Sequence, residues 1–280
     1  MFGGTYVNMK KTTRINIACG DSYVDGWLNF DYAPHSSAVS KTNLLGRLPL
    51  SDNEAEVVYS SHFFEHIPRS LVDSFLSECF RITKPRGRLR LVLPDFEEMC
   101  TTYLATRANG DHDKADFLTL EMLDQCVRMA PGGELGDFYA QLEASPTRHV
   151  EMIEFVRQRT GHTLQPVALY TGGRWARMLR NPARLLGRLE RLYCGLVVGL
   201  LPIAFRRQNV SLADVGERHA WIYDFHSVEQ LLKRVGFVNV ERVTSSTSNI
   251  VDFPFYPLDV TKEGLPRKGL ESMYIEAVKP

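Results

Sequence analysis

The pentapeptide HFFEH, residues 62–66, carries the residue types of a zinc site. Its H-x-x-E-H order matches a metalloprotease motif in which two histidines bind the metal beside a glutamate base. That chemistry requires His62 and His66 to share one face of a sustained helix, with a third ligand from elsewhere. Pro68 interrupts any helix two residues later, so we expect no metal site. We expect His62 to belong to a ligand-binding loop and His66 to pack in the core.

Two further motifs near the N-terminus indicate a nucleoside-like ligand. INIACGD (residues 15–21) runs into a turn at Gly20, which lets a backbone pass close to a ligand. It lacks the G-x-G-x-x-G pattern that admits a pyrophosphate. NFDYAP (residues 29–34) places Asp31 where an acid can accept hydrogen bonds from ribose hydroxyls. Each motif alone could be a plain turn, but their order and spacing together favour a ribose-containing ligand without phosphates.

Short runs rich in β-branched residues predict the strands that would position these motifs. Helical spacing predicts two helices, over 70–82 and over 227–235, the second ending at Gly236. KPRG at 84–87 is expected to form a turn. Strands alternating with helices predict a parallel sheet with a ligand crevice at the carboxyl ends of its strands. The expected strands are 14–19, 27–31, 56–60, 88–93, 237–243 and 272–278. The expected buried face of the first helix is Leu71, Phe75, Leu76, Cys79 and Phe80.

With these elements in order, the chain resembles the class I S-adenosylmethionine-dependent methyltransferases, of the broad type 11 subgroup. The resemblance implies an α/β, doubly wound Rossmann-like sheet, S-adenosyl-L-methionine as cofactor, and methyl transfer as the activity. Asn43 departs from the family, which often has an acid there, and KPRG replaces the usual KPGG. The first crossover, between Cys19 and Trp27, is too short for an ordinary helix. The matching segments are INIACGD, GWLNFD, LPLSDNEAEVVYSSHFFEHI, LSECFRITKPRGRLRLVLPD, HAWIYDFHSVEQLLKRVGF and MYIEAVKP.

The resemblance implies cofactor contacts at the ends of the first three expected strands and at Asn43. The backbone after the first strand would line the methionine part, and Asp31 would hold the ribose. Asn43 and an apolar neighbour would face adenine, and the residues after the third long strand would border the methionine end. The implied cofactor-binding residues are Ala18, Cys19, Gly20, Asp31, Tyr32, Asn43, Leu44, Ser60, Ser61 and His62.

Three residues are candidates for catalysis. Asp95 follows the strand that ends in LVLP and would lie beside the methyl group, although it could equally cap the next helix. His219 is a candidate general base because the ordinary pKa of histidine lies near neutrality. Tyr223 lies on the same segment but could belong to the core with Trp221, and Asp224 could cap the helix that follows.

The segment between the fourth long strand and the second helix has little strand character and predicts a helical insertion. We expect three parts: residues 1–100 and 216–280 as the front and back halves of the Rossmann-like domain, and 101–215 as the insertion. Residues 171–207 carry eight arginines and one acid. The part over 182–207 could meet a membrane surface as a basic amphipathic helix followed by an apolar run. It could equally pack on its own domain or on a second subunit.

Composition indicates which partners and which cellular compartment to expect. Lysine plus arginine and aspartate plus glutamate both number 33, so charge gives no indication of nucleic acid. Five scattered cysteines without a C-x-x-C pair favour reduced thiols in the cytoplasm. The start has no apolar signal-peptide region, and the uncharged run over 192–205 is too short to span a bilayer.

The resemblance favours O-methylation of a sugar hydroxyl in glycan or surface-polysaccharide biosynthesis. The alternatives are methylation of another small metabolite, or a non-catalytic cofactor-binding protein that docks a partner through the insertion. The protein could form an oligomer under any of these three hypotheses.

Overall fold

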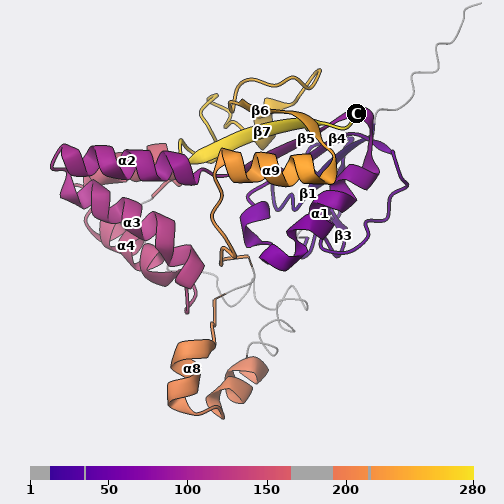
Figure 1. The fold of residues 1–280 in the computed structure, drawn as a ribbon. Coiled ribbons are helices and arrows are strands. Elements are labelled where there is room, and N and C mark those ends of the chain that lie inside the picture. Colours follow the sequence, from indigo (N-terminus) through magenta and orange to yellow (C-terminus); the bar gives the residue numbers. More distant parts are fainter. Residues whose placement is uncertain (1–12, 35, 165–191, 214–215) are drawn as a thin grey trace, which may run out of the picture.

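The computed structural model describes residues 13–34, 36–164, 192–213 and 216–280. A seven-stranded sheet of order β3-β2-β1-β4-β5-β7-β6 lies at its centre (Figure 1). The strands are β1 (Arg14–Ile17), β2 (Leu28–Asp31), β3 (Ser40–Lys41), β4 (Ala55–Ser61), β5 (Thr83–Pro94), β6 (Val238–Val243) and β7 (Ser272–Val278).

The first five strands are parallel, and β7 runs antiparallel to both β5 and β6. The strand order reverses between β1 and β4, which are neighbours in the sheet. Ligands in open α/β sheets bind at such a switch point, outside the carboxyl ends of the strands. The expected α/β Rossmann-like fold class is therefore confirmed.

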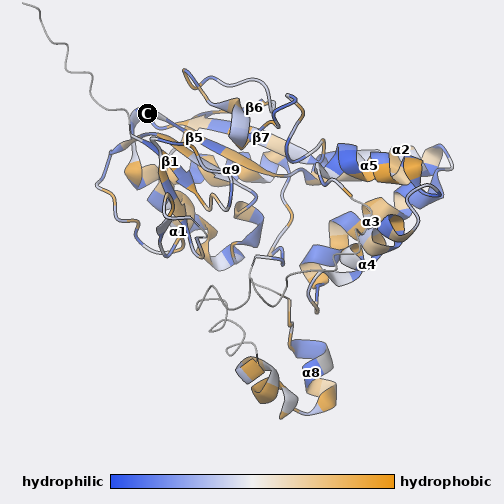
Figure 2. Cartoon of the chain, turned by 180° about the vertical axis from the view of Figure 1, so that it is seen from behind, coloured by the Kyte–Doolittle hydropathy of each residue, from blue (hydrophilic) through white to orange (hydrophobic). Residues whose placement is uncertain are grey.

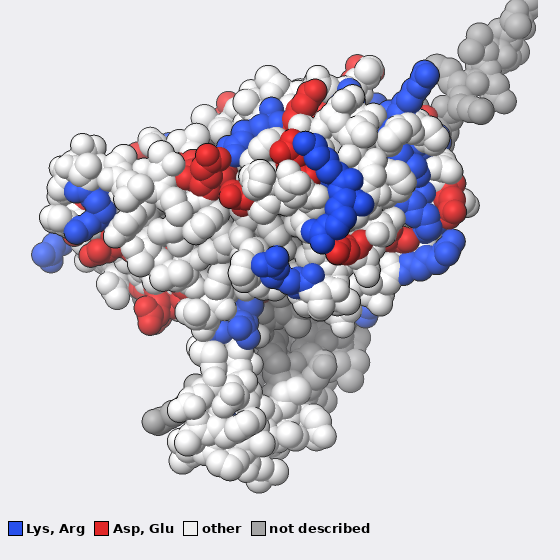
Figure 3. All heavy atoms as spheres, viewed as in Figure 1, with Lys and Arg blue, Asp and Glu red and all other residues white. Residues whose placement is uncertain are grey.

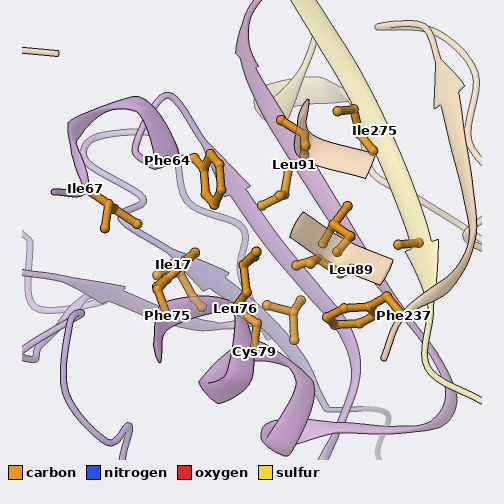
Figure 4. Close-up of a cluster of buried hydrophobic side chains, with 14 of the residues drawn as sticks. Ile17, Phe64, Ile67, Phe75, Leu76, Cys79, Leu89, Leu91, Phe237 and Ile275 are labelled. Carbon is orange, nitrogen blue, oxygen red and sulfur yellow. The ribbon is translucent and has the colours of Figure 1, made fainter. Parts of the chain in front are cut away.

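One face of the sheet is covered by α1 (Arg69–Ile82) and α9 (Phe225–Val235). Alternate residues of the central strands point toward these helices, as a pleated strand requires. Figure 4 shows Ile17, Leu89, Leu91 and Ile275 of the strands facing side chains of α1 such as Leu76. The same cluster includes Val72, which is buried, whereas the expected Leu71 is exposed. The predicted stripe was therefore wrong at Leu71, whereas Phe75, Leu76 and Cys79 are buried as predicted.

The opposite face is covered mainly by an irregular segment before β7. Tyr59 and Tyr274 of the sheet pack there against Ile250, Phe253 and Leu258. The short helix α10 (Phe255–Leu258) lies in this segment. The two sides of the sheet are thus closed by different means, two helices on one side and largely a loop on the other.

A group of helices follows β5 and extends to one side of the sheet (Figure 1). α3, α4 and α5 share a separate buried cluster built on Phe117, Leu135, Leu142 and Val156. This agrees with the expected helical character of the insertion, while its limits at residues 101 and 215 stay a prediction. The helices are α2 (Phe96–Ala108), α3 (His112–Val127), α4 (Gly133–Ala144), α5 (Val150–Thr160) and α8 (Ile203–Asn209).

Local departures from the expected elements have simple causes. The connection between β1 and β2 contains turns and no helix, as its shortness indicated. The two-residue strand β3 was not expected, because so short an edge strand leaves no pattern. The KPRG segment forms an irregularity inside β5, where Ala55 pairs with Thr83 but Val57 pairs with Arg88.

The arginine-rich arm is only partly described. Arg184, Arg188 and Arg191 lie outside the described residues, whereas residues 192–199 are helical and lead into α8. Figure 1 shows these two helices apart from the sheet and from α2–α4. Within the described ranges, no helix combines the length and apolar character needed to cross a membrane.

Candidate cofactor and acceptor site

The loops after β1 and β4 meet at the switch point of the sheet. Ile17 pairs with Ser60 and with Phe30 of β2, so the residues that follow these strands lie at one edge. Ala18 and His62 both have positive φ angles, of 57° and 50°. Left-handed backbone is uncommon outside glycine and concentrates at ligand-binding sites. The strain supports a ligand-binding role for this edge.

Asp31 at the end of β2 reaches across to the loop after β1. Its Oδ2 accepts a hydrogen bond from the Gly20 N–H at 2.9 Å, and its Oδ1 accepts from the Ala33 N–H at 2.9 Å. Two carboxylate oxygens offer about four acceptor sites, so Asp31 retains capacity for two ribose hydroxyls. The carboxylate fixes the glycine loop and can still bind a ligand.

The remaining residues of the implied cofactor set differ in exposure. Leu44 is buried, while Asn43 and Tyr32 are exposed. The Asn43 Oδ1 accepts from the Leu45 N–H at 3.2 Å and keeps one lone pair free. Cys19 is buried, and burial raises the pKa of its thiol to about 12. Cys19 is therefore a neutral apolar wall whose backbone, and not its sulfur, can contact a ligand.

Ser60 at the end of β4 is buried, and its Oγ has no hydrogen-bond partner among the described residues. Ser60, Ser61 and His62, which were predicted to border the cofactor, lie at this edge of the sheet. Their contact with a cofactor stays a prediction.

A polar cluster lies just beyond β4, around the 3-10 turn Phe64–His66. Glu65 is only 1% exposed, and His219, from the segment before α9, is 8% exposed. The His62 Nδ1 lies 3.3 Å from Glu65 Oε1, and the His66 Nε2 lies 3.9 Å from it. The rings of His66 and His219 meet edge to face at 4.8 Å.

The charges of this cluster follow from its burial. Burial favours the neutral form of Glu65, but the neighbouring imidazoles of His62, His66 and His219 outweigh it and hold the pKa of Glu65 at about 2. Burial lowers the pKa of His219 to about 4 and also lowers that of His62. At neutral pH the cluster therefore contains the ionised carboxylate of Glu65 beside the neutral imidazoles of His62 and His219.

Asp95, at the end of β5, is engaged on both oxygens. It caps α2 by accepting from the N–H groups of Glu97 and Glu98, and it pairs with Arg242 of β6. Burial raises the pKa of Asp95, and the charge of Arg242 opposes this. The helix-capping interpretation of Asp95 is therefore confirmed. Its role as a base stays a prediction.

Tyr223 is buried against Phe64, with ring centroids 4.9 Å apart, and its backbone bridges to Asp95. Its hydroxyl has no hydrogen-bond partner among the described residues. The core packing expected for Tyr223 is therefore present.

The sequence did not reveal that Arg242 pairs with Asp95, nor that Glu65 faces His219. No local pattern links positions so far apart. The HFFEH motif was the available signal for Glu65, and it assigned the glutamate a different role.

Residues 28–91 match the family model described as "Methyltransferase domain". This range holds β2, β3, β4 and most of β5, with Asp31 and the turn that carries Glu65, while β1 and the loop after it lie before the matched range. This part of the chain therefore resembles a methyltransferase domain.

Solved structures similar to this chain are distant in sequence. A SAM-dependent methyltransferase from Archaeoglobus fulgidus is 11% identical, with a TM-score of 0.40 over 96% of this chain and 86% of that one. A SAM-dependent methyltransferase from Thermotoga maritima, titled a possible histamine N-methyltransferase, is 11% identical, with a TM-score of 0.38 over 96% and 82%. Likenesses this weak do not bear on the acceptor. No curated protein matches the sequence significantly.

Proposed function

We propose that this methyltransferase methylates a sugar hydroxyl in glycan or surface-polysaccharide biosynthesis. The observation that supports an oxygen acceptor is the cluster of Glu65, His66 and His219 beside the loop after β4. A buried carboxylate and imidazoles can bind a hydroxyl and take its proton. The acceptor oxygen would attack the sulfonium methyl in line, and most of the rate would come from holding the two reactants in that geometry.

His219 is the favoured base in this proposal. Burial lowers its pKa to about 4, so its imidazole is neutral at physiological pH and has a nitrogen lone pair, although it is a weaker base than an ordinary histidine. Asp95 is less suited, since helix α2 and Arg242 already occupy its oxygens.

Labelled S-adenosylmethionine offered with candidate acceptors tests the proposal. We expect label in a sugar O-methyl ether, identified by mass spectrometry of the product. Transfer to a non-sugar metabolite would replace the glycan assignment. Cofactor binding without transfer to any acceptor class would favour a non-catalytic binding protein.

We also propose that the protein works in the cytoplasm at the membrane surface, where a lipid-linked acceptor would be found. Its five thiols are free, which fits a reducing compartment. Leu192, Leu196 and Leu200 on the protruding helix region are largely exposed, the last to 87%. Figure 2 shows apolar positions on this helical region. Figure 3 shows that the side of this region that faces the viewer carries few charged residues.

Vesicle flotation tests the membrane contact. We expect the protein to float with vesicles rich in anionic lipid at low salt, because each arginine near such a surface contributes about 1 kcal/mol. Changing Leu196 and Leu200 to Asp should abolish flotation. Leu104→Asp, an exposed leucine on α2, is the matched control and should float normally. Flotation that survives the double substitution would contradict the membrane contact.

A further inference from the structure

The side chains of Glu65, His66 and His219 converge although they come from two distant parts of the chain. One potential ligand atom from each lies within 4.8 Å of the others. Zinc is bound by histidine nitrogens and carboxylate oxygens at about 2.0–2.2 Å, so tetrahedral neighbours lie roughly 3.4 Å apart. Small side-chain rotations would bring these atoms to that spacing.

Backbone hydrogen bonds hold the two segments in register. The Glu65 carbonyl accepts from the N–H groups of Ala220 and Trp221, at 2.7 and 3.2 Å. The His219 N–H donates to the Gln125 carbonyl of α3 at 3.0 Å. The segments that carry the three side chains are therefore fixed by backbone contacts among the 3-10 turn Phe64–His66, α3 and the segment before α9.

The ring orientation of His66 suits a metal ligand. Its Nδ1 lies 2.7 Å from the Arg218 carbonyl oxygen. A carbonyl can only accept, so Nδ1 carries a proton, and the other ring nitrogen, Nε2, lies 3.9 Å from Glu65 Oε1. Metal-binding histidines usually make such a bond through the other ring nitrogen, which fixes the tautomer.

The carboxylate of Glu65 supplies an independent indication. The side chain is 1% exposed, and neither oxygen has a hydrogen-bond partner among the described residues. The His62 Nδ1 is 3.3 Å away but is not aligned as a donor, and the His62 Nε2 pairs with the Ser272 Oγ. Buried carboxylates normally pair with a cation or bind a metal, and the contact that Glu65 makes with His62, at 3.3 Å, is a long one.

We propose that Glu65, His66 and His219 bind one divalent transition-metal ion, with Zn²⁺ as the reference ion. Two histidines and one glutamate are the ligand set of open zinc sites, which leave a fourth position for water or substrate. Such an ion would polarise an oxygen ligand held at that position. It would occupy the His219 lone pair, and would then replace this imidazole as the group that activates a hydroxyl.

This proposal differs from the prediction made from the HFFEH motif, which was that no metal binds there. That expectation took His62 and His66 as the ligand pair on a helix, with Glu65 as a base. In the structure Phe64–His66 is a single 3-10 turn, Glu65 is a candidate ligand, and the third ligand is His219. The absence of a sustained helix therefore excludes the protease arrangement but not this one.

Metal binding by the untagged, full-length chain tests the proposal without any assay of methyl transfer. Protein stripped with a chelator is dialysed against Zn²⁺, and bound metal is counted by elemental analysis. We expect one ion per chain. Co²⁺ in its place should give visible absorption typical of a low-coordinate site with nitrogen and oxygen ligands.

Glu65→Gln, His66→Gln and His219→Gln should each weaken Zn²⁺ binding at least about 100-fold, more than loss of a supporting contact does. His226→Gln, at an exposed histidine of α9, is the matched control and should bind normally. Calorimetry with S-adenosylhomocysteine checks that each variant keeps its fold.

No saturable Zn²⁺ or Co²⁺ binding by the stripped protein would overturn the proposal. Such a result would mean that the charge of the Glu65 carboxylate is balanced by a positive group of the protein, such as the nearby ammonium of Lys268, and not by a metal ion. Binding that all three substitutions leave unchanged would overturn it as well. Either result leaves methyl transfer to be judged separately, since cofactor binding and product formation are measured without the metal count.

Discussion

Asp31 joins the loops after β1 and β2, because one carboxylate accepts from both Gly20 and Ala33. We expect Asp31→Ala to weaken S-adenosylhomocysteine binding by about 1.5–3 kcal/mol, the usual loss for a hydrogen bond to a charged group. Isothermal calorimetry measures the change. Asp25→Ala, at an exposed acid of the same connection, should leave affinity unaltered. Equal affinity in both variants would remove Asp31 from the site.

His219 is held by backbone contacts to α3 and lies beside Glu65. We expect His219→Ala to lower turnover about 100-fold or more while sparing cofactor affinity, as loss of a general acid–base group does. Steady-state kinetics and calorimetry on the same preparation separate the two effects. His226→Ala is the control on turnover. Normal turnover in His219→Ala would leave positioning alone as the source of catalysis.

At the scale of one element, α9 has a complete set of end signals. Asp224 and Ser227 form a reciprocal capping box, and Gly236 ends the helix with a φ of 111°. We expect Asp224→Ala to lower the free energy of unfolding by about 1 kcal/mol, the usual cost of losing such a cap. Urea denaturation measures it. Glu229→Ala, which loses only a surface pair with Lys233, should cost less.

The effect of Asp224 should also depend on pH. Hydrogen bonds from the Ser227 hydroxyl and backbone N–H lower the pKa of Asp224 below its ordinary value. A depressed folded-state pKa means that the stabilisation is complete above the unfolded-state pKa of about 3.9 and is lost as pH falls through the lower folded value. The stability difference between wild type and Asp224→Ala should therefore be constant near neutrality and shrink in acid. A difference that grows in acid would contradict the assignment.

At the scale of the whole molecule, Arg90 connects β5 to the irregular cover of the sheet. Its guanidinium is fully buried and pairs with Asp259 and Glu276, each at 2.6 Å. Arg90→Met would leave two buried carboxylates without their cation, and we expect a loss of about 3–5 kcal/mol in unfolding free energy. Arg88→Met is the matched control, because Arg88 is partly exposed on the same strand and only 4.0 Å from Glu276. Equal losses in both variants would show that Arg90 acts through general packing.

The sequence by itself determined the local elements of this protein. Runs of β-branched residues located the strands β1, β2, β4, β5, β6 and β7, because a buried pleated strand selects such residues wherever it lies. Asp224 and Gly236 fixed α9 in the same local way. Gly20 and Asp31, in their order after two successive strands, predicted that the cofactor binds at this edge.

Only the tertiary structure decided which distant side chains meet. The insertion of β7 between β5 and β6, the pairing of Asp95 with Arg242, and the meeting of Glu65 with His219 leave no periodic signal. The HFFEH motif illustrates the limit, since its residues were evident but its geometry was not. Local pattern fixes the conformation of a segment and the face that it buries. Which residues pack on that face depends on strand register and on the path of the intervening chain. Sequences with the same local pattern can differ in both.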